Sequence, residues 1–386
     1  MSINPPGTAF TVSEYRICTQ CVMDTSDPDI RFDEDGVCHH CHDYRKNLLT
    51  RVLPSGEREV ALDALMGKMR TAGRSRDYDC IAGVSGGVDS TYAIHLARRL
   101  GLRVLAVHFD NGWNSELAVS NIENALKRLD TQLFTKVMDW EEFRQLQLAF
   151  LRSSTPDGEI PTDHAIYATL IDAALKTGVR YIVSGMNYAT ESSSVPAWSY
   201  GHSDWKYIRG VNRVMGGNRL RSFPHYSLGR LFRAVFLRRI RFISLLNYID
   251  YDKSTAVETI MKELDWRDYG GKHHESVYTR FYQGYILPKK FGIDKRRAHL
   301  SDLMKAGKGP SREQALEELR SEPYPVELQR QDRDFIVKKF GLLSGEFEAI
   351  MKARPKTFRD YPNNFEKVKK VRAVVHALRA RGLYPR

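Results

Sequence analysis

Short apolar runs alternate with helical patterns between residues 80 and 186, and this alternation constrains the fold more than any other feature of the chain. Four runs are expected to form strands: CIAGV (80–84), RVLAVHF (103–109), TQLFTKVM (131–138) and RYIVSGM (180–186). Helical periodicity predicts helices over residues 88–100, 116–129, 141–151 and 164–176. Strands that are apolar throughout and are separated by helices predict an α/β fold, a parallel sheet with helices on both faces.

The loops that leave this sheet indicate where a ligand would bind. In open parallel sheets, ligands bind beyond the carboxyl ends of the strands, where neighbouring loops diverge. The loops after Val84, Phe109 and Met186 all fall at that edge. We therefore expect the functional site there.

The whole chain is expected to have three parts. Residues 1–50 carry four cysteines and too few apolar residues to fold without a staple, which predicts a small zinc-binding module. Residues 51–200 contain the sheet domain, preceded by an amphipathic helical stretch. Residues 201–386 are mostly helical in pattern and rich in basic and aromatic residues, as expected of a substrate or partner region.

Charge and composition narrow the class of protein. The chain has 59 Lys and Arg against 47 Asp and Glu, a net charge of +12, which favours nucleotides, nucleic acid or an acidic membrane surface as partners. The first 18 residues lack a basic segment followed by an apolar core, and no run of 18 uncharged apolar residues occurs. A cytoplasmic protein without a spanning segment is therefore expected.

Four of the five cysteines form two C-x2-C pairs separated by sixteen residues, and they are Cys18, Cys21, Cys38 and Cys41. Four thiolates at this spacing can close a tetrahedron around Zn2+ and leave no open position, so the metal would be structural. Reduced thiols and an iron–sulfur cluster are the alternatives. A ligand could also come from a neighbouring histidine, namely His39, His40 or His42. The fifth cysteine, Cys80, is expected to be a small core residue.

The loop SGGVDS connects the first strand to the first helix of the sheet domain. Gly86 and Gly87 would let backbone amides approach a phosphate, and the hydroxyls of Ser85 and Ser90 would add donors. Asp89 would repel phosphate unless a cation lies between them, which predicts a Mg2+ ligand. The alternative is a glycine turn that Ser and Asp merely cap. The Gly-Lys-Ser/Thr ending of the common nucleoside-triphosphate loop is missing.

At these residues the sequence resembles the PP-loop ATP pyrophosphatases, a superfamily that includes GMP synthetase and several tRNA-modifying enzymes. The resemblance implies that the loop holds the terminal pyrophosphate of ATP and that the bond between the α- and β-phosphates is cleaved. It also implies adenosine contacts from VHFDNGWNSE, through His108 and Asp110, with Asn111 matching by position. From SGMNYATES it implies close approach at Gly185 and a catalytic Glu191, which could instead cap a helix.

The whole chain resembles a narrower family, the N-acetyl sugar amidotransferases of bacterial surface-glycan (LPS O-antigen) biosynthesis. The resemblance rests on CTQCVMDTSDPDIRFDEDGVCHHC, SGGVDS, FDNGWNSE and the stretch from DWRDYGGKHHES to KRRAHLS. It implies conversion of an acetamido group of an acidic, UDP-linked sugar into an acetamidino group, with ammonia from a separate glutaminase and a bridging subunit between them. ATP and Mg2+ would be the cofactors beside Zn2+.

Residues 265–301, called the late segment here, contain basic residues that are predicted to contact phosphates or the reacting group. Lys272 and Lys295 are predicted as catalytic, and His273 and Arg296 as substrate ligands; solvated surface charge is the alternative for each. The aromatic stretch WSYGHSDWKYIRGVNRVMGG would bind the acceptor sugar through Lys206 and Arg209. A core position for its aromatic residues is the alternative.

The role of one basic and apolar segment has several alternatives, and the function of the protein has one competing interpretation. Residues 228–249 are predicted as one amphipathic helix, which could lie on an anionic membrane, dock the glutaminase, or pack in the core. A tRNA-thiolating enzyme of the same superfamily is the competing function, because the +12 charge suits RNA as well. Nucleic acid is not the favoured partner, since only Cys80 lies outside the cysteine pairs to carry sulfur chemistry.

Overall fold

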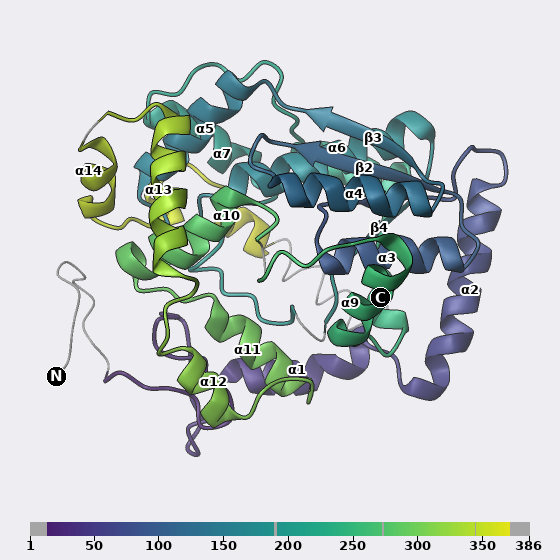
Figure 1. The fold of residues 1–386 in the computed structure, drawn as a ribbon, viewed down its shortest axis with the longest axis horizontal. Coiled ribbons are helices and arrows are strands. Elements are labelled where there is room, and N and C mark those ends of the chain that lie inside the picture. The colour runs from purple at the N-terminus through teal and green to yellow at the C-terminus, as the bar shows by residue number, and fades with distance from the viewer. Residues whose placement is uncertain (1–13, 189–190, 272–273, 344, 371–386) are drawn as a thin grey trace.

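A five-stranded, fully parallel sheet forms the centre of the molecule (Figure 1). The computed structural model describes residues 14–188, 191–271, 274–343 and 345–370. The strand order is β3-β2-β1-β4-β5. The bounds are Cys80–Gly83 for β1, Val104–Asp110 for β2, Gln132–Val137 for β3, Tyr181–Ser184 for β4 and Arg241–Ser244 for β5. The predicted α/β fold is confirmed.

Alternate residues of the strands supply two separate cores. Cys80 and Ala82 of β1 face a cluster that also holds apolar residues of α2, α3, α4 and α9. Ile81 of β1 faces the opposite cluster, which is built mainly against α6. Because β1, β2 and β4 are buried on both faces, these central strands are mostly apolar, whereas the edge strand β3 is largely exposed. The predicted core position of Cys80 is confirmed, and burial raises the pKa of its thiol.

The helices of the sheet domain match their predicted positions to within a few residues. They are α2 (Ser55–Gly73), α3 (Val88–Arg99), α4 (Glu116–Arg128), α5 (Trp140–Ser153) and α6 (Ile160–Thr177). Ser115 and Asp139 accept hydrogen bonds from first-turn amides of α4 and α5, which explains where these two helices begin.

The prediction of one helix over residues 228–249 is wrong. This segment forms a short helix α8 (Leu228–Phe232), a π-helical turn η1 (Arg233–Leu237), strand β5 and a 3-10 turn η2 (Leu245–Tyr248). The backbone turns at Arg239, whose φ is 56°. Beyond it the chain pairs in parallel with β4, so sheet pairing overrides the helical spacing of the apolar residues. The sheet thus draws one strand from beyond residue 200, the predicted domain boundary.

The remaining elements form the N-terminal module and the C-terminal region. They are α1 (His39–Arg51), α7 (Trp205–Val214), α9 (Lys253–Leu264), α10 (Val277–Phe281), η3 (Tyr282–Phe291), α11 (Arg296–Lys305), α12 (Arg312–Glu318), α13 (Val326–Phe340), α14 (Glu346–Lys352) and η4 (Phe358–Asp360). Figure 1 shows α11 and α12 beside α1, away from the sheet. None of the helices in the described ranges is long and apolar enough to cross a membrane.

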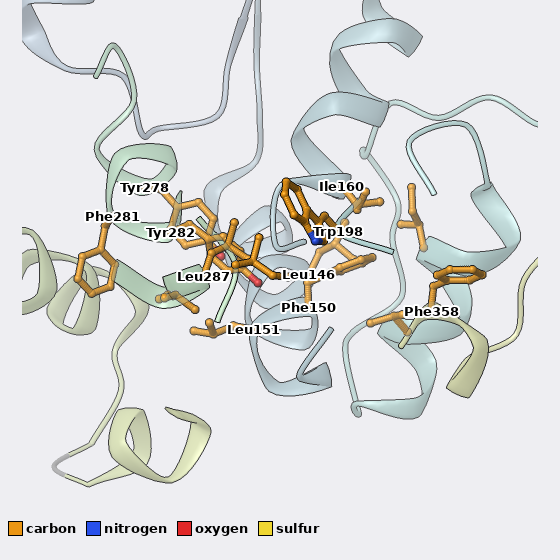
Figure 2. Packing of buried hydrophobic residues seen from close by; sticks show 14 of the residues in the cluster. Leu146, Phe150, Leu151, Ile160, Trp198, Tyr278, Phe281, Tyr282, Leu287 and Phe358 are labelled. Carbon is orange, nitrogen blue, oxygen red and sulfur yellow. The ribbon is translucent and has the colours of Figure 1, made fainter. Parts of the chain in front are cut away.

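The third core joins the C-terminal region to the sheet domain (Figure 2). Tyr278 and Tyr282 pack with Leu146 and Phe150 of α5 in one buried cluster. The four cysteines of the N-terminal pairs belong to the same cluster. The cysteine module is therefore continuous with the body of the protein in its packing.

Candidate functional site

The loop between β1 and α3 has the backbone that a phosphate-binding turn requires. Gly86 adopts a φ of +81°, and a side chain there would lie 2.5 Å from the Ala118 carbonyl oxygen, so only glycine fits. The Ser85 and Ser90 hydroxyls lie 3.2 Å apart. No side chain caps α3 at its N-cap residue Gly87, which leaves the positive end of the helix directed at the loop.

The loop after β4 lies directly against this turn. A Cβ on Gly185 would lie 2.6 Å from both the Asp89 carbonyl carbon and the Ser90 nitrogen. The strand order reverses between β1 and β4, and the crevice at such a reversal is where parallel sheets bind ligands. Gly185 thus lets the loop after β4 approach the SGGVDS turn closely, while its predicted role beside a bound ligand stays a prediction.

The loop after β2 is organised by a buried histidine. His108 Nδ1 lies 2.9 Å from the Val84 carbonyl, which only accepts, so this nitrogen carries the proton. With Nδ1 protonated, Nε2 accepts from the Asn114 amide at 3.0 Å. Asp110 accepts from the amide of Gly112 at 2.9 Å. His108 thus positions the loop with both ring nitrogens, while Asp110 stays partly exposed at the end of β2.

A segment far along the chain, residues 266–275, contacts the SGGVDS turn through three side chains that were not predicted as site residues. Trp266 Nε1 donates to the Gly86 carbonyl at 2.8 Å. A Cβ on Gly87 would lie 3.4 Å from both the Tyr269 hydroxyl and the Glu275 carboxylate. The stretch DWRDYGGKHHES contains all three of these residues, but the sequence pattern indicates only its basic side chains as functional.

Asp89 is held by a tyrosine of the same region. The Tyr251 hydroxyl donates to Asp89 Oδ1. Burial, followed by the charge of Asp89, raises the pKa of Tyr251, so the hydroxyl keeps its proton and remains the donor. Glu191 raises the same pKa further, which places its carboxylate in this neighbourhood.

Loop 191–193 is fixed by a buried ion pair on α11. Asp302 accepts from the Ser192 hydroxyl at 2.7 Å and from the Ser193 amide at 3.0 Å. Lys305 lies 2.7 Å from the same carboxylate, and both side chains are buried. The loop that carries Glu191 is therefore positioned by the C-terminal region.

A cluster of acidic residues lies at the start of α6. Burial and then the charge of Asp163 raise the pKa of Glu159 to about 8. Burial lowers the pKa of His202, but the hydrogen bond and charge of Asp163 outweigh it, so the net shift is upward. The charge of Lys295, the predicted catalytic lysine, lowers the pKa of both Glu159 and His202, so Lys295 is an electrostatic neighbour of this cluster.

Most other basic residues of the late segment have protein partners. Arg296 pairs with Asp294 at 2.7 Å and also donates to two backbone carbonyls. Lys290 donates to the Ser154 hydroxyl at 2.8 Å, and burial lowers its pKa to about 8. Lys272 and His273 lie outside the described residues. The role of Arg296 as a substrate ligand stays a prediction.

The aromatic stretch predicted to bind the acceptor lies largely in the core. Trp198 and Tyr207 are buried in the cluster shown in Figure 2, where Trp198 is labelled. Lys206 donates to the Asn363 carbonyl at 3.0 Å, and Arg209 is exposed on α7. Trp198 and Tyr207 therefore occupy the core, as the alternative interpretation of this stretch predicts.

The four cysteine sulfurs form a compact, buried cluster. The S···S distances are 4.0 Å for Cys18–Cys41, 3.7 Å for Cys21–Cys38 and 3.8 Å for Cys38–Cys41. A tetrahedral site with Zn–S bonds of about 2.3 Å has edges of about 3.8 Å. Backbone amides point at the sulfurs, for example the Cys38 amide at 3.2 Å from Cys18 Sγ. The residues present therefore fit a structural zinc ion.

The neighbouring histidines lie outside this tetrahedron. His40 Nε2 bonds to Asp27 at 2.8 Å, and His42 Nε2 bonds to Asp33 at 2.7 Å. His39 Nδ1 accepts from the Arg31 amide at 3.2 Å. Their hydrogen bonds tie the module together and leave the four sulfurs as the ligand set.

Part of the C-terminal region matches a known protein family. Residues 275–372 match a family model described as "LPS biosynthesis protein WbpG-like, C-terminal domain". We refer to residues 275–372 as the WbpG-like segment. The match covers about a quarter of the chain, and for this segment the resemblance to proteins of LPS biosynthesis is confirmed. The comparison with curated proteins found no match.

Solved structures give only distant likenesses. NMN synthetase from Francisella tularensis is 14% identical, covering 72% of this chain and 94% of its own, with a TM-score of 0.31. NH3-dependent NAD synthetase from Campylobacter jejuni is 14% identical, covering 55% and 89%, with a TM-score of 0.29. A predicted subunit of tRNA methyltransferase from Methanocaldococcus jannaschii is 12% identical, covering 47% and 75%, with a TM-score of 0.28.

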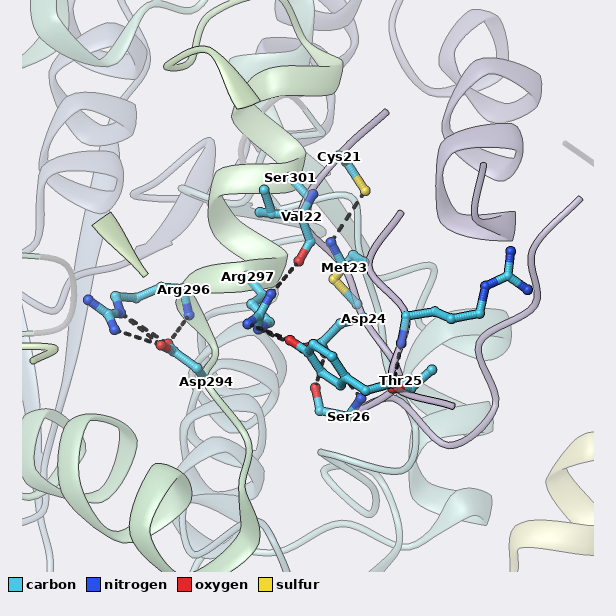
Figure 3. A network of polar contacts seen from close by, with 12 residues as sticks. Cys21, Val22, Met23, Asp24, Thr25, Ser26, Asp294, Arg296, Arg297 and Ser301 are labelled. Atoms are coloured by element: carbon cyan, nitrogen blue, oxygen red, sulfur yellow. Dashed lines mark hydrogen bonds and ion pairs between the residues drawn. The ribbon is translucent and has the colours of Figure 1, made fainter. Parts of the chain in front are cut away.

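The WbpG-like segment holds the cysteine module in place. Arg312 of α12 donates to the carbonyls of Cys18 and Cys21 at 2.9–3.2 Å. Arg297 of α11 pairs with Asp24 at 2.9 Å and donates to the Val22 carbonyl (Figure 3). The same segment fixes loop 191–193 through Asp302, so it links the module to the site at the sheet edge.

Proposed function

We propose that the protein is an ATP-dependent amidotransferase of LPS biosynthesis that converts the acetamido group of a nucleotide-linked, acidic N-acetyl sugar into an acetamidino group. The observation that carries this proposal is the SGGVDS turn. It lies where the strand order reverses between β1 and β4, it includes Asp89, no lysine ends it, and the chain continues into a WbpG-like segment.

The turn offers donors for two phosphates. Backbone amides at Gly86 and Gly87, with the Ser85 and Ser90 hydroxyls, would hold the β- and γ-phosphates of ATP at the end of α3. Asp89, held by Tyr251, would bind Mg2+, which neutralises phosphate charge. A phosphate-loop lysine serves transfer of the γ-phosphoryl group, so its absence favours cleavage at the α-phosphate.

The proposed reaction has two steps that balance. The acetamido oxygen attacks the α-phosphorus of ATP, the bond from that phosphorus to the β-bridging oxygen breaks, and pyrophosphate leaves. Ammonia then adds to the activated carbon and loses a proton, and AMP departs with the former amide oxygen. Catalysis is largely positioning and charge stabilisation, to which Glu191, Lys272 and Lys295 would contribute.

Ammonia is proposed to come from a separate glutaminase, through a bridging subunit. Within the described ranges, Cys80 is the one cysteine outside the four-sulfur cluster. It lies in the core with its pKa raised by burial, which does not suit an exposed nucleophile. This supports a partner for the glutaminase step.

The test is to incubate the protein with ATP, Mg2+, ammonium and a panel of acetamido nucleotide-sugars. AMP and pyrophosphate should form in equal amounts, with a sugar product about one dalton lighter, because NH replaces O. Asp89→Asn should abolish pyrophosphate release, whereas Asp63→Asn, a matched change at an exposed position of α2, should not. Formation of ADP and phosphate would contradict the proposal.

A further inference from the structure

Large apolar side chains are exposed on the turn that precedes β5. Leu228, Phe232, Val235, Phe236 and Leu237 fall within ten residues, and Phe232 and Leu237 are 57% and 69% exposed. The Phe232 and Phe236 rings stack with centroids 4.6 Å apart. This gathering is denser than the single apolar residues that ordinary protein surfaces carry.

The turn is anchored on α6 by packing and an ion pair. Leu231 and Ala234 pack into the cluster against α6, and Arg230 pairs with Asp172 of that helix at 2.6 Å. The Ile240 amide donates to the Ala234 carbonyl at 3.0 Å, closing the π-helical turn. The exposed phenylalanines are therefore presented by an anchored element.

The ionisable side chains of the turn itself are all basic, although Asp172 of α6 pairs with Arg230. Residues 228–241 contain five arginines, no acidic residue, and otherwise only glycine and apolar residues. Every polar side-chain group in this stretch is thus a cationic donor. A hollow of about 690 Å3 opens beside the turn and is lined by Leu175, Gly229, Arg230, Arg233, Ala234 and Arg238. Its walls suit an anionic phosphate group.

We infer that this surface docks the protein on an anionic phospholipid bilayer. The apolar side chains would enter the boundary between headgroups and acyl chains, while the arginines and the hollow would bind lipid phosphates. A second copy of the same surface fits poorly, because a two-fold contact would oppose arginine with arginine. An uncharged surface would leave the guanidinium groups without anions.

The geometry also fixes which way the active site would face. Helix α6 begins beside Glu159 at the candidate site and reaches the hollow at Leu175. At 1.5 Å per residue, these positions are about 24 Å apart. The docked protein would hold its site away from the lipid, open to substrate from solution.

The test measures binding of the full chain to phosphatidylcholine vesicles with and without phosphatidylglycerol. We expect binding only when phosphatidylglycerol is present, and weakening with salt. The double variant Arg233→Ala/Arg238→Ala should weaken the partition about 30-fold. The control Arg320→Ala/Arg330→Ala removes two other exposed arginines, near α12 and on α13, and it should bind as the wild type does.

A Phe232→Trp variant reports insertion independently of charge. Its fluorescence should shift to the blue with phosphatidylglycerol vesicles and stay unchanged with neutral ones. Failure of the wild type to bind, or equal loss in the control double variant, would overturn the inference. Self-association that the Arg233→Ala/Arg238→Ala variant abolishes, without vesicle binding, would assign the surface to a second copy instead.

Discussion

Replacing Gly185 with alanine tests whether the crevice between β1 and β4 is as tight as the structure has it. The new methyl carbon would lie 2.6 Å from the Asp89 carbonyl carbon and the Ser90 nitrogen, and 2.8 Å from the Asp89 oxygen. Carbon atoms in contact are normally about 3.5 Å apart or more. Because all three neighbours are backbone atoms, the loop and the first turn of α3 must separate by about 1 Å.

The magnitude follows from that displacement. Overpacking of this kind costs about 1–3 kcal/mol of folding free energy. A displacement of about 1 Å at reacting groups can cost on the order of 100-fold in rate. We expect Gly185→Ala to lose stability in that range and to lose pyrophosphate release by about the larger factor.

The assay is urea unfolding beside kcat and KM for ATP in pyrophosphate release. Gly67→Ala is the matched control, because a methyl group there meets no atom within 4 Å and α2 should gain about 0.5–1 kcal/mol. Wild-type stability and kinetics in Gly185→Ala would refute the geometric reasoning, since the two backbone segments could then not be in contact.

Three further outcomes are expected. Metal analysis should find one zinc per chain, with the four cysteine thiols reacting with Ellman's reagent only after chelation; iron with visible absorption would contradict the zinc assignment. Burial raises the pKa of Glu159 from 4.5 to about 8, so the folded chain binds this proton more tightly than the unfolded chain. The contribution to stability is full below pH 4.5 and is lost as the pH rises through about 8, and Glu159→Gln should remove this fall in urea unfolding across that range; an unchanged slope would count against the burial of the carboxyl. Tyr251→Phe should raise the Mg2+ concentration needed for half-maximal pyrophosphate release while ATP binding persists, because a charge-assisted hydrogen bond to Asp89 worth about 1.5–3 kcal/mol is lost; an unchanged Mg2+ dependence would mean that Asp89 needs no such support.

Sequence periodicity predicted β1, β2 and β4 and their helices because these three central strands are buried on both faces of the sheet; it also predicted β3, an edge strand that is largely exposed. It missed β5, since residues 241–244 follow an apolar spacing that also fits a helix, and pairing with β4 decides the outcome. The apolar pattern of a segment therefore predicts its secondary structure where helices cover it on both faces, and it fails where pairing with a distant strand decides the outcome.

The site divides in the same way. Gly86, Ser85 and Ser90 were predictable because a turn of this type needs those residues locally. Trp266, which bonds to Gly86 from 180 residues away, carries no local mark of that contact. The basic residues were chosen by charge, which does not distinguish a ligand from a protein partner such as Asp294 beside Arg296.

The most direct test of the proposed chemistry follows the acetamido oxygen. A nucleotide-sugar labelled with oxygen-18 in its acetamido group is incubated with the protein, ATP, Mg2+ and ammonium. The masses of the products are then measured by mass spectrometry. Attack of that oxygen on the α-phosphorus predicts one labelled oxygen in AMP, none in pyrophosphate and an unlabelled acetamidino sugar. Label in inorganic phosphate, or AMP without label beside the amidine, would contradict the account.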